Sequence, residues 1–254
     1  MAAEPAGSEL GHVLVIVPTY NEAPTIEKAI GRVRMAAPHA DILVVDDGSP
    51  DGTGSIVTEI GRTDERVHLL ARAGKQGLGS AYIAGFNWGL ERRYDVLVEM
   101  DADGSHQPEQ LPDLLSALSD ADLVIGSRYI RGGAVVNWPR RRELLSRTAN
   151  RYVNTVLGMG VSDATGGFRA FRARTVEEIG LESVRSQGYC FQVDVTWRTI
   201  RAGLRVVEQP ITFVEREEGQ SKMSGVVVRE ALVQVTRWGM RHRWSQMRGL
   251  WRKR

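Results

Sequence analysis

The sequence predicts an α/β fold, in which one domain is built on a mostly parallel sheet flanked by helices. Short apolar runs alternate with amphipathic stretches through the first half of the chain, as in repeated strand–helix units. The runs are nearly unbroken and rich in β-branched residues, as expected for parallel strands buried on both faces. No repeat, low-complexity tract or linker divides the 254 residues, so a single domain is the economical interpretation.

Strands and helices are expected to alternate regularly in the first half. The expected strands are 13–17, 42–45, 67–70, 96–100 and 123–125. The helices between them are expected at about 24–36, 53–61, 79–92 and 108–118. Thr53 and Pro108 are suitable residues at which helices begin. Right-handed crossovers would then bring the carboxyl ends of the strands to one edge of the sheet, where ligands bind in such folds.

The second half has a less regular pattern. Gly132, Gly133 and Pro139 predict a loop over 128–140. Beyond it we expect a helix at 141–157, a turn and a strand within 164–171, a helix at 190–201, a strand pair near 205–214, a loop at 215–221 and a long helix from about 223. The predicted organisation is a flexible N-terminus over 1–11, the folded domain over 12–230 and a basic amphipathic segment over 231–254.

Composition excludes several classes of protein. Apolar residues make up 42% and charged residues 25%, which is ordinary for a globular chain, and a net charge of +2 gives no bulk attraction to nucleic acid. Cys190 is the single cysteine, so the chain has neither an internal disulfide nor a cysteine-based zinc site. The first twelve residues do not read as a signal peptide, and no run of about 18 apolar residues occurs. We therefore expect a cytoplasmic protein that meets a membrane only at its surface.

Two aspartates follow the predicted strand 96–100 directly. Asp101 and Asp103 stand two residues apart just past a strand end, where two carboxylates can share a hard cation. Ser105 and His106 follow and can add a ligand or a water contact. Asp-x-Asp alone is a weak motif and also fits a plain polar turn, but its place after a buried strand favours a metal site.

Polar segments also end the first two strands. Tyr20 offers a flat face to a nucleobase, and Glu22 can accept hydrogen bonds from a base or ribose. Asp46 and Asp47 stand where nucleotide-binding folds place an acidic residue against the ribose. A plain strand–turn–helix junction or an acidic turn explains each segment separately. The glycines at 74–85 form neither a dinucleotide fingerprint nor a Walker motif, which disfavours a dinucleotide or ATP site.

Taken together, the segments 18–22, 46–53 and 101–103 resemble the family 2 glycosyltransferases of the GT-A fold, which is Rossmann-like. Within that family, the sequence is similar to the polyprenyl-phosphate (dolichyl-phosphate) mannose synthases over about residues 13–225. The motifs that carry this narrower resemblance are Lys75–Gly79, Gly126–Tyr129, Gly132–Gly133, Asn137–Pro139, Thr165–Phe168 and Gly219–Met223.

The resemblance implies an inverting transfer of mannose from GDP-mannose to polyprenyl monophosphate. It implies a Mg²⁺ or Mn²⁺ ion held by Asp101 and Asp103, with Ser105 standing where some relatives have glutamine. The residues it implies for the donor are Pro18, Tyr20, Glu22, Val45, Asp47, Ala102, Asp103, Arg216 and Lys222. The residues it implies for the acceptor phosphate are Arg128, Arg142 and Ser146, and the implied catalytic set is Asp101, Asp103 and Arg128.

The residues themselves favour a phosphate acceptor over an alcohol. An alcohol needs a general base, and Asp194, the best candidate, lies within a helical pattern. A phosphate monoester is already an anionic nucleophile near neutral pH, but it needs cationic recognition. Residues 128–151 hold seven arginines and one acidic residue, which is what such an acceptor requires. A solvated basic face explains some of these arginines equally well.

The C-terminal segment suggests contact with a membrane surface. No acidic residue follows Glu230, whereas tryptophans alternate with arginines from Trp238 onwards. This composition is typical of membrane interfaces, although a basic tail or a helix that docks on a partner protein also fits. Gln234–Trp238 matches the Q-x-x-R-W pattern of processive synthases by chance, because their transmembrane helices and acidic pair are missing.

Two other hypotheses remain open at this point. The same fold can use UDP-glucose or another nucleotide sugar on the same lipid phosphate, since Tyr20 and Asp47 do not separate guanine from uracil. Alternatively, the chain is a non-catalytic subunit at the membrane surface, although the intact Asp101, Asp103, Arg128 and Lys222 argue against a decayed site. A chain that acts on a lipid carrier also suggests an integral-membrane partner protein.

Overall fold

A computed structural model describes residues 10–184, 186, 188–215, 232–241 and 244 of the chain. Its centre is a seven-stranded sheet with the strand order β3-β2-β1-β4-β7-β5-β8. The strands are β1 (Val13–Thr19), β2 (Asp41–Asp46), β3 (Val67–Ala71), β4 (Val96–Glu99), β5 (Leu123–Ser127), β7 (Arg169–Arg172) and β8 (Val206–Pro210). A separate parallel pair joins β6 (Ala134–Val136) to β9 (Thr212–Val214).

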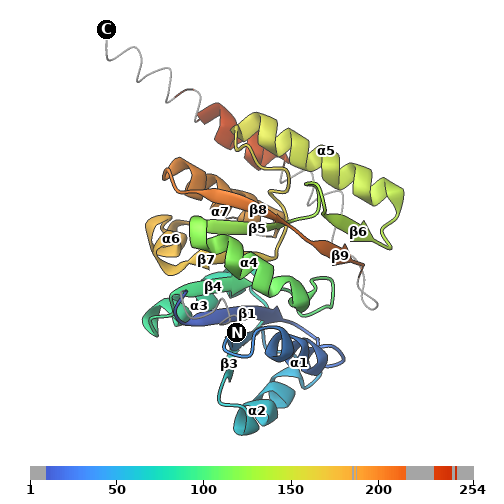
Figure 1. Cartoon of the computed structure of the whole chain (residues 1–254), viewed down its shortest axis with the longest axis vertical. Coiled ribbons are helices and arrows are strands. Elements are labelled where there is room, and N and C mark those ends of the chain that lie inside the picture. Colours follow the sequence, from blue (N-terminus) through green and yellow to red (C-terminus); the bar gives the residue numbers. More distant parts are fainter. Residues whose placement is uncertain (1–9, 185, 187, 216–231, 242–243, 245–254) are drawn as a thin grey trace, which may run out of the picture.

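Helices cover the two faces of this sheet (Figure 1). The α-helices are α1 (Ile26–Ala36), α2 (Thr53–Thr63), α3 (Leu78–Glu91), α4 (Leu111–Ala117), α5 (Arg140–Leu157), α6 (Ala173–Glu178) and α7 (Tyr189–Arg201). Short 3₁₀ turns occupy Pro108–Gln110, Leu118–Asp120 and Leu181–Ser183. The predicted α/β fold with a mostly parallel sheet is confirmed, and Thr53 and Pro108 each begin a helical element as expected.

Alternate residues of the strands bury opposite faces of the sheet. In β1, Leu14 and Ile16 join the core under α3, α5 and α7, whereas Val15 and Val17 join the core under α1, α2 and α4. This explains the unbroken apolar runs, because both faces of a parallel strand are covered. Gly85 lets α3 lie close to the sheet, since a Cβ there would come within 2.5 Å of the Ile16 Cγ2 atom.

One strand runs against the others. β7 pairs antiparallel with both β4 and β5, while the other pairings in the sheet are parallel. Because β7 lies between β4 and β5, those two strands point the same way and their carboxyl ends reach the same edge. The loop that enters β7 also arrives at that edge, and this loop brings a further group of polar residues to it.

Three expectations about the second half were wrong in detail. The expected loop over 128–140 contains β6 at 134–136, and the helix α6 was not expected. The strands near 205–214 do not pair with each other, because β8 joins β5 in the large sheet and β9 joins β6. β6 contains only three apolar residues and is partly exposed, so its run is too short to identify a strand from the sequence.

Only part of the expected C-terminal helix falls within the described residues. Residues 232–241 are helical and pack against α5, where Tyr152 Oη lies 2.6 Å from Thr236 Oγ1. Trp238 stacks on Trp197 at a centroid distance of 6.0 Å. The rest of the predicted amphipathic segment over 231–254, the loop at 216–221 and the N-terminal residues 1–9 lie outside the described residues. Within the described part, no helix is both long and apolar enough to cross a membrane.

Candidate active site

The two aspartates lie just past the end of β4, at the carboxyl edge of the sheet. Tyr82 Oη of α3 donates a hydrogen bond to Asp101 Oδ1 over 3.2 Å. The backbone N–H and the hydroxyl of Ser105 both donate to Asp103 Oδ1, at 3.1 and 2.5 Å. Ser105 itself is buried. A tight turn thus fixes both carboxylates at the edge where the fold is expected to bind a ligand.

The buried imidazole of His106 supports this turn, and the imidazole is neutral. The backbone N–H of Asp101 donates to His106 Nδ1 over 3.0 Å, so the ring carries its proton on Nε2. Burial lowers the pKa of His106, and the attraction of the Asp101 carboxylate does not reverse this. Because the ring is neutral, it makes no ion pair with Asp101, although His106 Nδ1 lies 3.9 Å from Asp101 Oδ2. The imidazole stacks on Phe168, which anchors the turn to the core.

A buried carboxyl group lies behind the two aspartates. Glu99 is fully buried at the end of β4, opposite Arg169 of β7. Burial raises the pKa of Glu99 to about 7; Arg169 opposes this shift and Asp101 adds to it. Burial and then the carboxylates of Asp101 and Glu99 also raise the pKa of Tyr82, so its phenol remains a donor. The neutral phenol of Tyr82 thus holds the Asp101 carboxylate in place from α3.

Arg169 holds the loop that enters β7. Its buried guanidinium donates to three carbonyl oxygens, those of Gly166 (2.7 Å), Ala164 (2.8 Å) and Gln192 (2.8 Å). The loop then passes beside Asp101 at Gly167. A Cβ built on Gly167 would lie 3.8 Å from Asp101 Oδ2, so this loop runs directly beside the carboxylate.

The ends of β1 and β2 form the second part of the site. Asp46 ties these ends together, because its carboxylate accepts hydrogen bonds from Thr19 Oγ1 at 2.8 Å and from the backbone N–H of Ser49 at 2.9 Å. Asn21 has a left-handed backbone, with a φ angle of 61°, and its N–H donates to Ser49 Oγ. The two loops therefore hold each other in one arrangement.

Asp47 and Tyr20 each meet a basic residue for which no role was predicted. Arg72, just after β3, donates from Nη1 to Asp47 Oδ1 over 2.6 Å in a largely buried ion pair. The ammonium of Lys75 lies 4.3 Å from the centroid of the Tyr20 ring. The same rule of strand ends identifies Arg72, because it directly follows the third strand.

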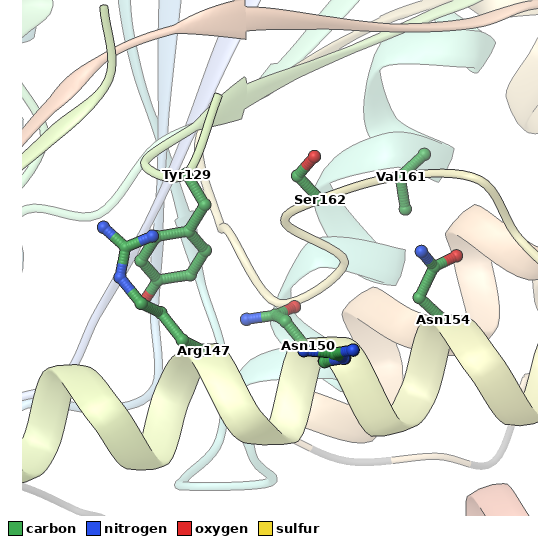
Figure 2. Close-up of a pocket in the computed structure, with 7 residues that line it drawn as sticks. Tyr129, Arg147, Asn150, Asn154, Val161 and Ser162 are labelled. Atoms are coloured by element: carbon green, nitrogen blue, oxygen red, sulfur yellow. The ribbon is translucent and has the colours of Figure 1, made fainter. Parts of the chain in front are cut away.

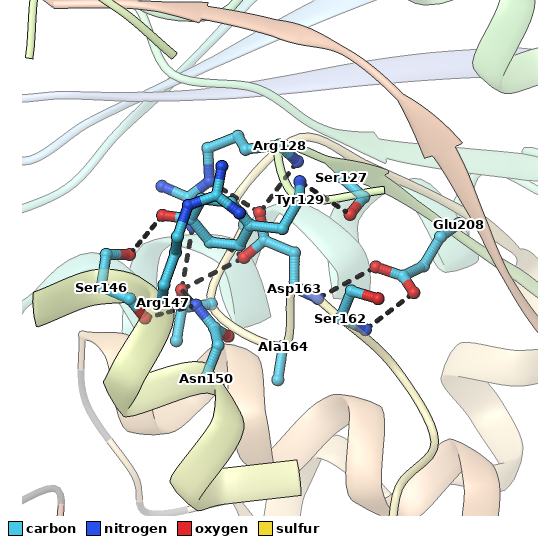
Figure 3. A network of polar contacts seen from close by, with 12 residues as sticks. Ser127, Arg128, Tyr129, Ser146, Arg147, Asn150, Ser162, Asp163, Ala164 and Glu208 are labelled. Atoms are coloured by element: carbon cyan, nitrogen blue, oxygen red, sulfur yellow. Dashed lines mark hydrogen bonds and ion pairs between the residues drawn. The ribbon is translucent and has the colours of Figure 1, made fainter. Parts of the chain in front are cut away.

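Arg128, which follows β5, forms an ion pair with Asp163, a residue that was not predicted from the sequence. Its Nε and Nη2 atoms donate to the two carboxylate oxygens of Asp163 at 2.6 and 2.7 Å, and Nη2 also donates to Thr165 Oγ1 (Figure 3). Burial opposes ionisation of Asp163, but the Arg128 guanidinium outweighs it and holds the pKa of Asp163 below its usual range. Asp163 lies in a loop without a recognisable motif, so only its contact with Arg128 identifies it.

The other two predicted acceptor residues lie on α5. Ser146 Oγ accepts a hydrogen bond of 2.6 Å from Tyr129 Oη, next to Arg128 in the sequence. The guanidinium of Arg142 lies 4.1 Å from the centroid of the Trp138 ring, and its Nη1 donates to Glu215 Oε1 over 2.5 Å. Arg128 also lies 5.5 Å from that ring, so Trp138 is in contact with both arginines.

The predicted site residues therefore fall into two groups on one edge of the sheet. The donor group, which lies at the ends of β1, β2 and β4, comprises Pro18, Tyr20, Glu22, Val45, Asp47, Asp101, Ala102 and Asp103. The acceptor group of Arg128, Arg142 and Ser146 lies after β5 and on α5. Arg216 and Lys222 lie outside the described residues, so their predicted roles stay predictions.

This fold and site define a nucleotide-sugar transferase, and the chain belongs to glycosyl transferase family 2, whose family model matches residues 14–180. It is 58% identical to an undecaprenyl-phosphate mannosyltransferase of Micrococcus luteus over 236 residues, which is 93% of this chain and 97% of that protein. It is 57% identical to a polyprenol monophosphomannose synthase of Mycolicibacterium smegmatis over 239 residues, covering 93% of this chain and 90% of that protein.

Solved structures share the fold at lower identity. A mannosyltransferase of Pyrobaculum calidifontis in complex with GDP-mannose and Mn²⁺ superposes with a TM-score of 0.64 at 21% identity, covering 94% of this chain and 66% of that one. Glucosyl-3-phosphoglycerate synthase of Mycobacterium tuberculosis superposes with a TM-score of 0.66 at 19% identity, covering 91% and 82%. These two neighbours confirm the predicted fold class.

Proposed function

We propose that this chain transfers mannose from GDP-mannose to polyprenyl monophosphate, which yields polyprenyl-phosphate mannose and GDP. The structural observation that carries the proposal is the placement of Asp101 and Asp103 after β4 and of Arg128 after β5, on one edge of the sheet. Carboxylates suit the metal-bound diphosphate of a donor, and arginines suit an anionic acceptor. The two relatives that are 57–58% identical over nearly their full length carry names of this chemistry, which supports the same assignment.

The donor residues fit a nucleoside diphosphate at the ends of β1 and β2. Tyr20 would present its ring to a base, and Asp47 lies at the end of β2, where Arg72 and the backbone N–H of Gln76 hold its carboxylate. Pro18, Glu22 and Val45 would line the same nucleoside. Ala102 and Asp103 would then contact the diphosphate and sugar beyond it. Arg216 and Lys222 would approach the phosphates from the later part of the chain.

The residues around Asp101 and Asp103 fit a divalent cation. Two carboxylates stand two residues apart after β4, and after burial itself the Asp101 carboxylate is the next cause of the raised pKa of Tyr82. Among the described residues no group of three or more His, Cys, Asp or Glu side chains is arranged as a metal site. Phosphate oxygens of the donor, with Ser105 or water, would therefore complete the coordination of the cation. Either Mg²⁺ or Mn²⁺ would neutralise charge on the departing diphosphate.

The acceptor residues fit a phosphate monoester as the nucleophile. A phosphate oxygen of the lipid would attack C1 of mannose as the bond from C1 to the GDP oxygen breaks, so the anomeric centre inverts. This oxygen is already anionic, so no general base is required. Arg128, Arg142 and Ser146 would orient the phosphate on the far side of C1 from the diphosphate. Asp163 would keep the Arg128 guanidinium in one orientation.

Transfer of radiolabelled mannose from GDP-mannose to a short polyprenyl phosphate in detergent tests this proposal. We expect label in the lipid phase with Mg²⁺ or Mn²⁺ and none with EDTA, and the metal series would establish which ion is preferred. Activity with UDP-glucose but not with GDP-mannose would contradict the donor assignment. Inactivity with every donor in the presence of membranes would contradict the enzymatic function itself.

We also infer that the protein works at the cytoplasmic surface of a membrane, because its proposed acceptor is a lipid and its proposed donor is water-soluble. The basic segment over 231–254 would provide part of the attraction, at about 1 kcal/mol per basic residue near an anionic surface. An integral-membrane partner would strengthen it. Sedimentation with anionic and neutral vesicles tests this inference. Equal recovery with both vesicle types would contradict the electrostatic contribution.

A further inference from the structure

The tripeptide Asn137–Pro139, one of the motifs that carry the family resemblance, joins β6 to α5. Asn137 has a left-handed backbone with a φ angle of 64°, which asparagine adopts more readily than most residues. Pro139 restricts the backbone of the residue before it to extended conformations, and that residue is Trp138. The indole of Trp138 is therefore attached where the chain has little conformational freedom, directly before the first turn of α5.

The Trp138 ring is in contact with both arginines that are predicted to bind the acceptor phosphate. The Cζ atom of Arg142 lies 4.1 Å from the ring centroid, and the Cζ atom of Arg128 lies 5.5 Å from it. Among the described residues, no other ring contacts both guanidinium groups. An aromatic ring over the face of a guanidinium does not occupy the N–H groups at its edge, and the edge is where a phosphate binds.

Tyr129 is a second ring beside Arg128, but its other cation contact is with a different residue of α5. Its centroid lies 5.1 Å from Arg128 Cζ, and its ring lines a cavity of about 230 Å³ beside that helix (Figure 2). The Arg147 guanidinium lies 4.5 Å from the same centroid. In the described part of the chain, no such contact joins Tyr129 to Arg142, so Trp138 alone links the two acceptor arginines there.

Phe213 of β9 connects Trp138 to the turn that carries the proposed metal-binding aspartates. Its ring meets the indole edge to face, with centroids 5.4 Å apart and an interplanar angle of 78°. It meets the imidazole of His106, in that turn, at 5.4 Å and 77°. The backbone N–H of Val214 also donates to the carbonyl oxygen of Ser105 over 3.0 Å. The indole therefore has a defined position relative to both this turn and the acceptor arginines.

We propose that Trp138 is a positioning residue for the acceptor phosphate, because its indole holds the guanidinium groups of Arg142 and Arg128 at one place beside the turn. This inference rests on the proposed function, in which the two arginines bind the lipid phosphate. Arg128 has a buried partner in Asp163. The partner of Arg142 is Glu215, and that ion pair is partly exposed. Arg142 should therefore depend more on the indole, to which it is also closer.

Two substitutions separate the aromatic face of Trp138 from its bulk. Trp138→Leu keeps an apolar side chain and removes the aromatic face, whereas Trp138→Phe keeps that face. Among the described residues the indole N–H makes no hydrogen bond, so Trp138→Phe loses none. Trp88→Leu is the matched control, because Arg92 Cζ lies 4.0 Å from the centroid of the Trp88 ring and neither residue has a proposed role.

Two measurements give independent readouts. Steady-state kinetics with GDP-mannose and polyprenyl phosphate varied in turn give the two KM values. ¹⁵N relaxation of the Arg142 Nε–H group reports the order of its guanidinium without any substrate. All variants should fold, since Trp138 and Trp88 are each partly exposed, and their Tm values are compared.

We expect Trp138→Leu to raise the KM for polyprenyl phosphate about fivefold, the effect of one cation–π contact, with the KM for GDP-mannose unchanged. Trp138→Phe should stay within about twofold of the wild type, and Trp88→Leu should leave both KM values unchanged. Among these variants, the Arg142 Nε–H group should become more mobile in Trp138→Leu only. In an Arg142→Ala background, Trp138→Leu should have a smaller effect than in the wild type, because the two residues act together.

The positioning role is overturned if Trp138→Phe is impaired as much as Trp138→Leu, if both KM values rise together, or if Arg142 keeps its wild-type order in Trp138→Leu. Each of these outcomes leaves mannose transfer by the wild type intact, so the proposed function stands. No transfer by the wild type would contradict the proposed function itself, and the acceptor role of Trp138 with it.

Discussion

The carboxylate of Asp163 accepts two hydrogen bonds from the guanidinium of Arg128, with Nε–Oδ2 and Nη2–Oδ1 distances of 2.6 and 2.7 Å. Both side chains are buried, and the backbone N–H of Arg128 donates to the same carboxylate at 3.1 Å. A buried pair of this geometry contributes orientation as much as stability, because removal of either partner leaves an uncompensated charge. Arg128 is therefore held in one orientation by the protein itself.

We predict that Asp163→Asn lowers the free energy of unfolding at pH 7 by about 3 kcal/mol or more, because it leaves Arg128 buried without a counter-charge. The pKa of Asp163 is lowered in the folded state, so its stabilisation is present above the unfolded pKa near 3.8 and is lost as the pH falls below it. Denaturant unfolding from pH 7 to pH 3 measures the free energy of unfolding of both proteins. The difference between wild type and variant should become smaller only at the acid end of this range. A constant gap across that range would contradict the role of charge.

We predict that Asp103→Ala lowers kcat for mannose transfer by at least about a hundredfold and leaves the fold intact, because the carboxylate is proposed to hold the metal at the leaving diphosphate. Radiolabelled transfer gives the rate, and circular dichroism checks the fold. Asp113→Ala is the control, since Asp113 is an exposed aspartate of α4 away from the site. Wild-type activity in Asp103→Ala would show that the metal assignment is wrong.

We predict that Arg72→Leu raises the KM for GDP-mannose about tenfold with a smaller effect on kcat. Asp47 would lose its charged partner at 2.6 Å and keep the bond from the backbone N–H of Gln76, so it would be held less firmly toward the proposed nucleoside. Arg66→Leu is the matched control variant, because Arg66 pairs with Asp41 at the opposite end of β2, in a more exposed position. If both variants changed the KM equally, general destabilisation of β2 would explain the effect.

We predict that Arg142→Ala raises the KM for polyprenyl phosphate about tenfold and leaves the KM for GDP-mannose unchanged, because one phosphate contact is lost. Steady-state kinetics with each substrate varied in turn separate the two effects. Arg141→Ala removes the same charge from an exposed neighbouring position and should behave as wild type. An equal rise for donor and acceptor would argue against a role in acceptor binding.

Much of the fold could be predicted because local sequence patterns indicate most of its strands and helices. The strands β1, β2, β4 and β5 each contain a run of buried apolar residues, and β3 is a shorter, less buried run that follows the same strand–helix alternation. β7 was harder, because Arg169 lies buried at its start and satisfies its guanidinium on distant carbonyl oxygens. The partners of β8 and β9 could not be read from the sequence either, since pairing depends on residues more than 70 positions away, at β5 and β6.

The site was predictable where a motif follows a strand and not where a distant counter-ion completes it. Asp101 and Asp103 follow a buried strand, so their place at the sheet edge follows from the topology alone. Asp163 has no local signal, because a single aspartate in a loop usually faces water. It acts on Arg128 only because β7 brings its loop back to the edge of the sheet. The proposed roles of the site residues, including Arg216 and Lys222, remain predictions.

The antiparallel strand β7 fixes the spacing between the two parts of the proposed site. It separates β4, which is followed by Asp101 and Asp103, from β5, which is followed by Arg128. Neighbouring strands lie about 4.8 Å apart, so two such steps set these strand ends about 10 Å from each other. In the proposed reaction the leaving phosphate and the attacking phosphate both meet C1 of mannose, so both would have to fit within this interval. The width of one strand, rather than any flexible side chain, would thus set the distance between the proposed metal site and the proposed acceptor site.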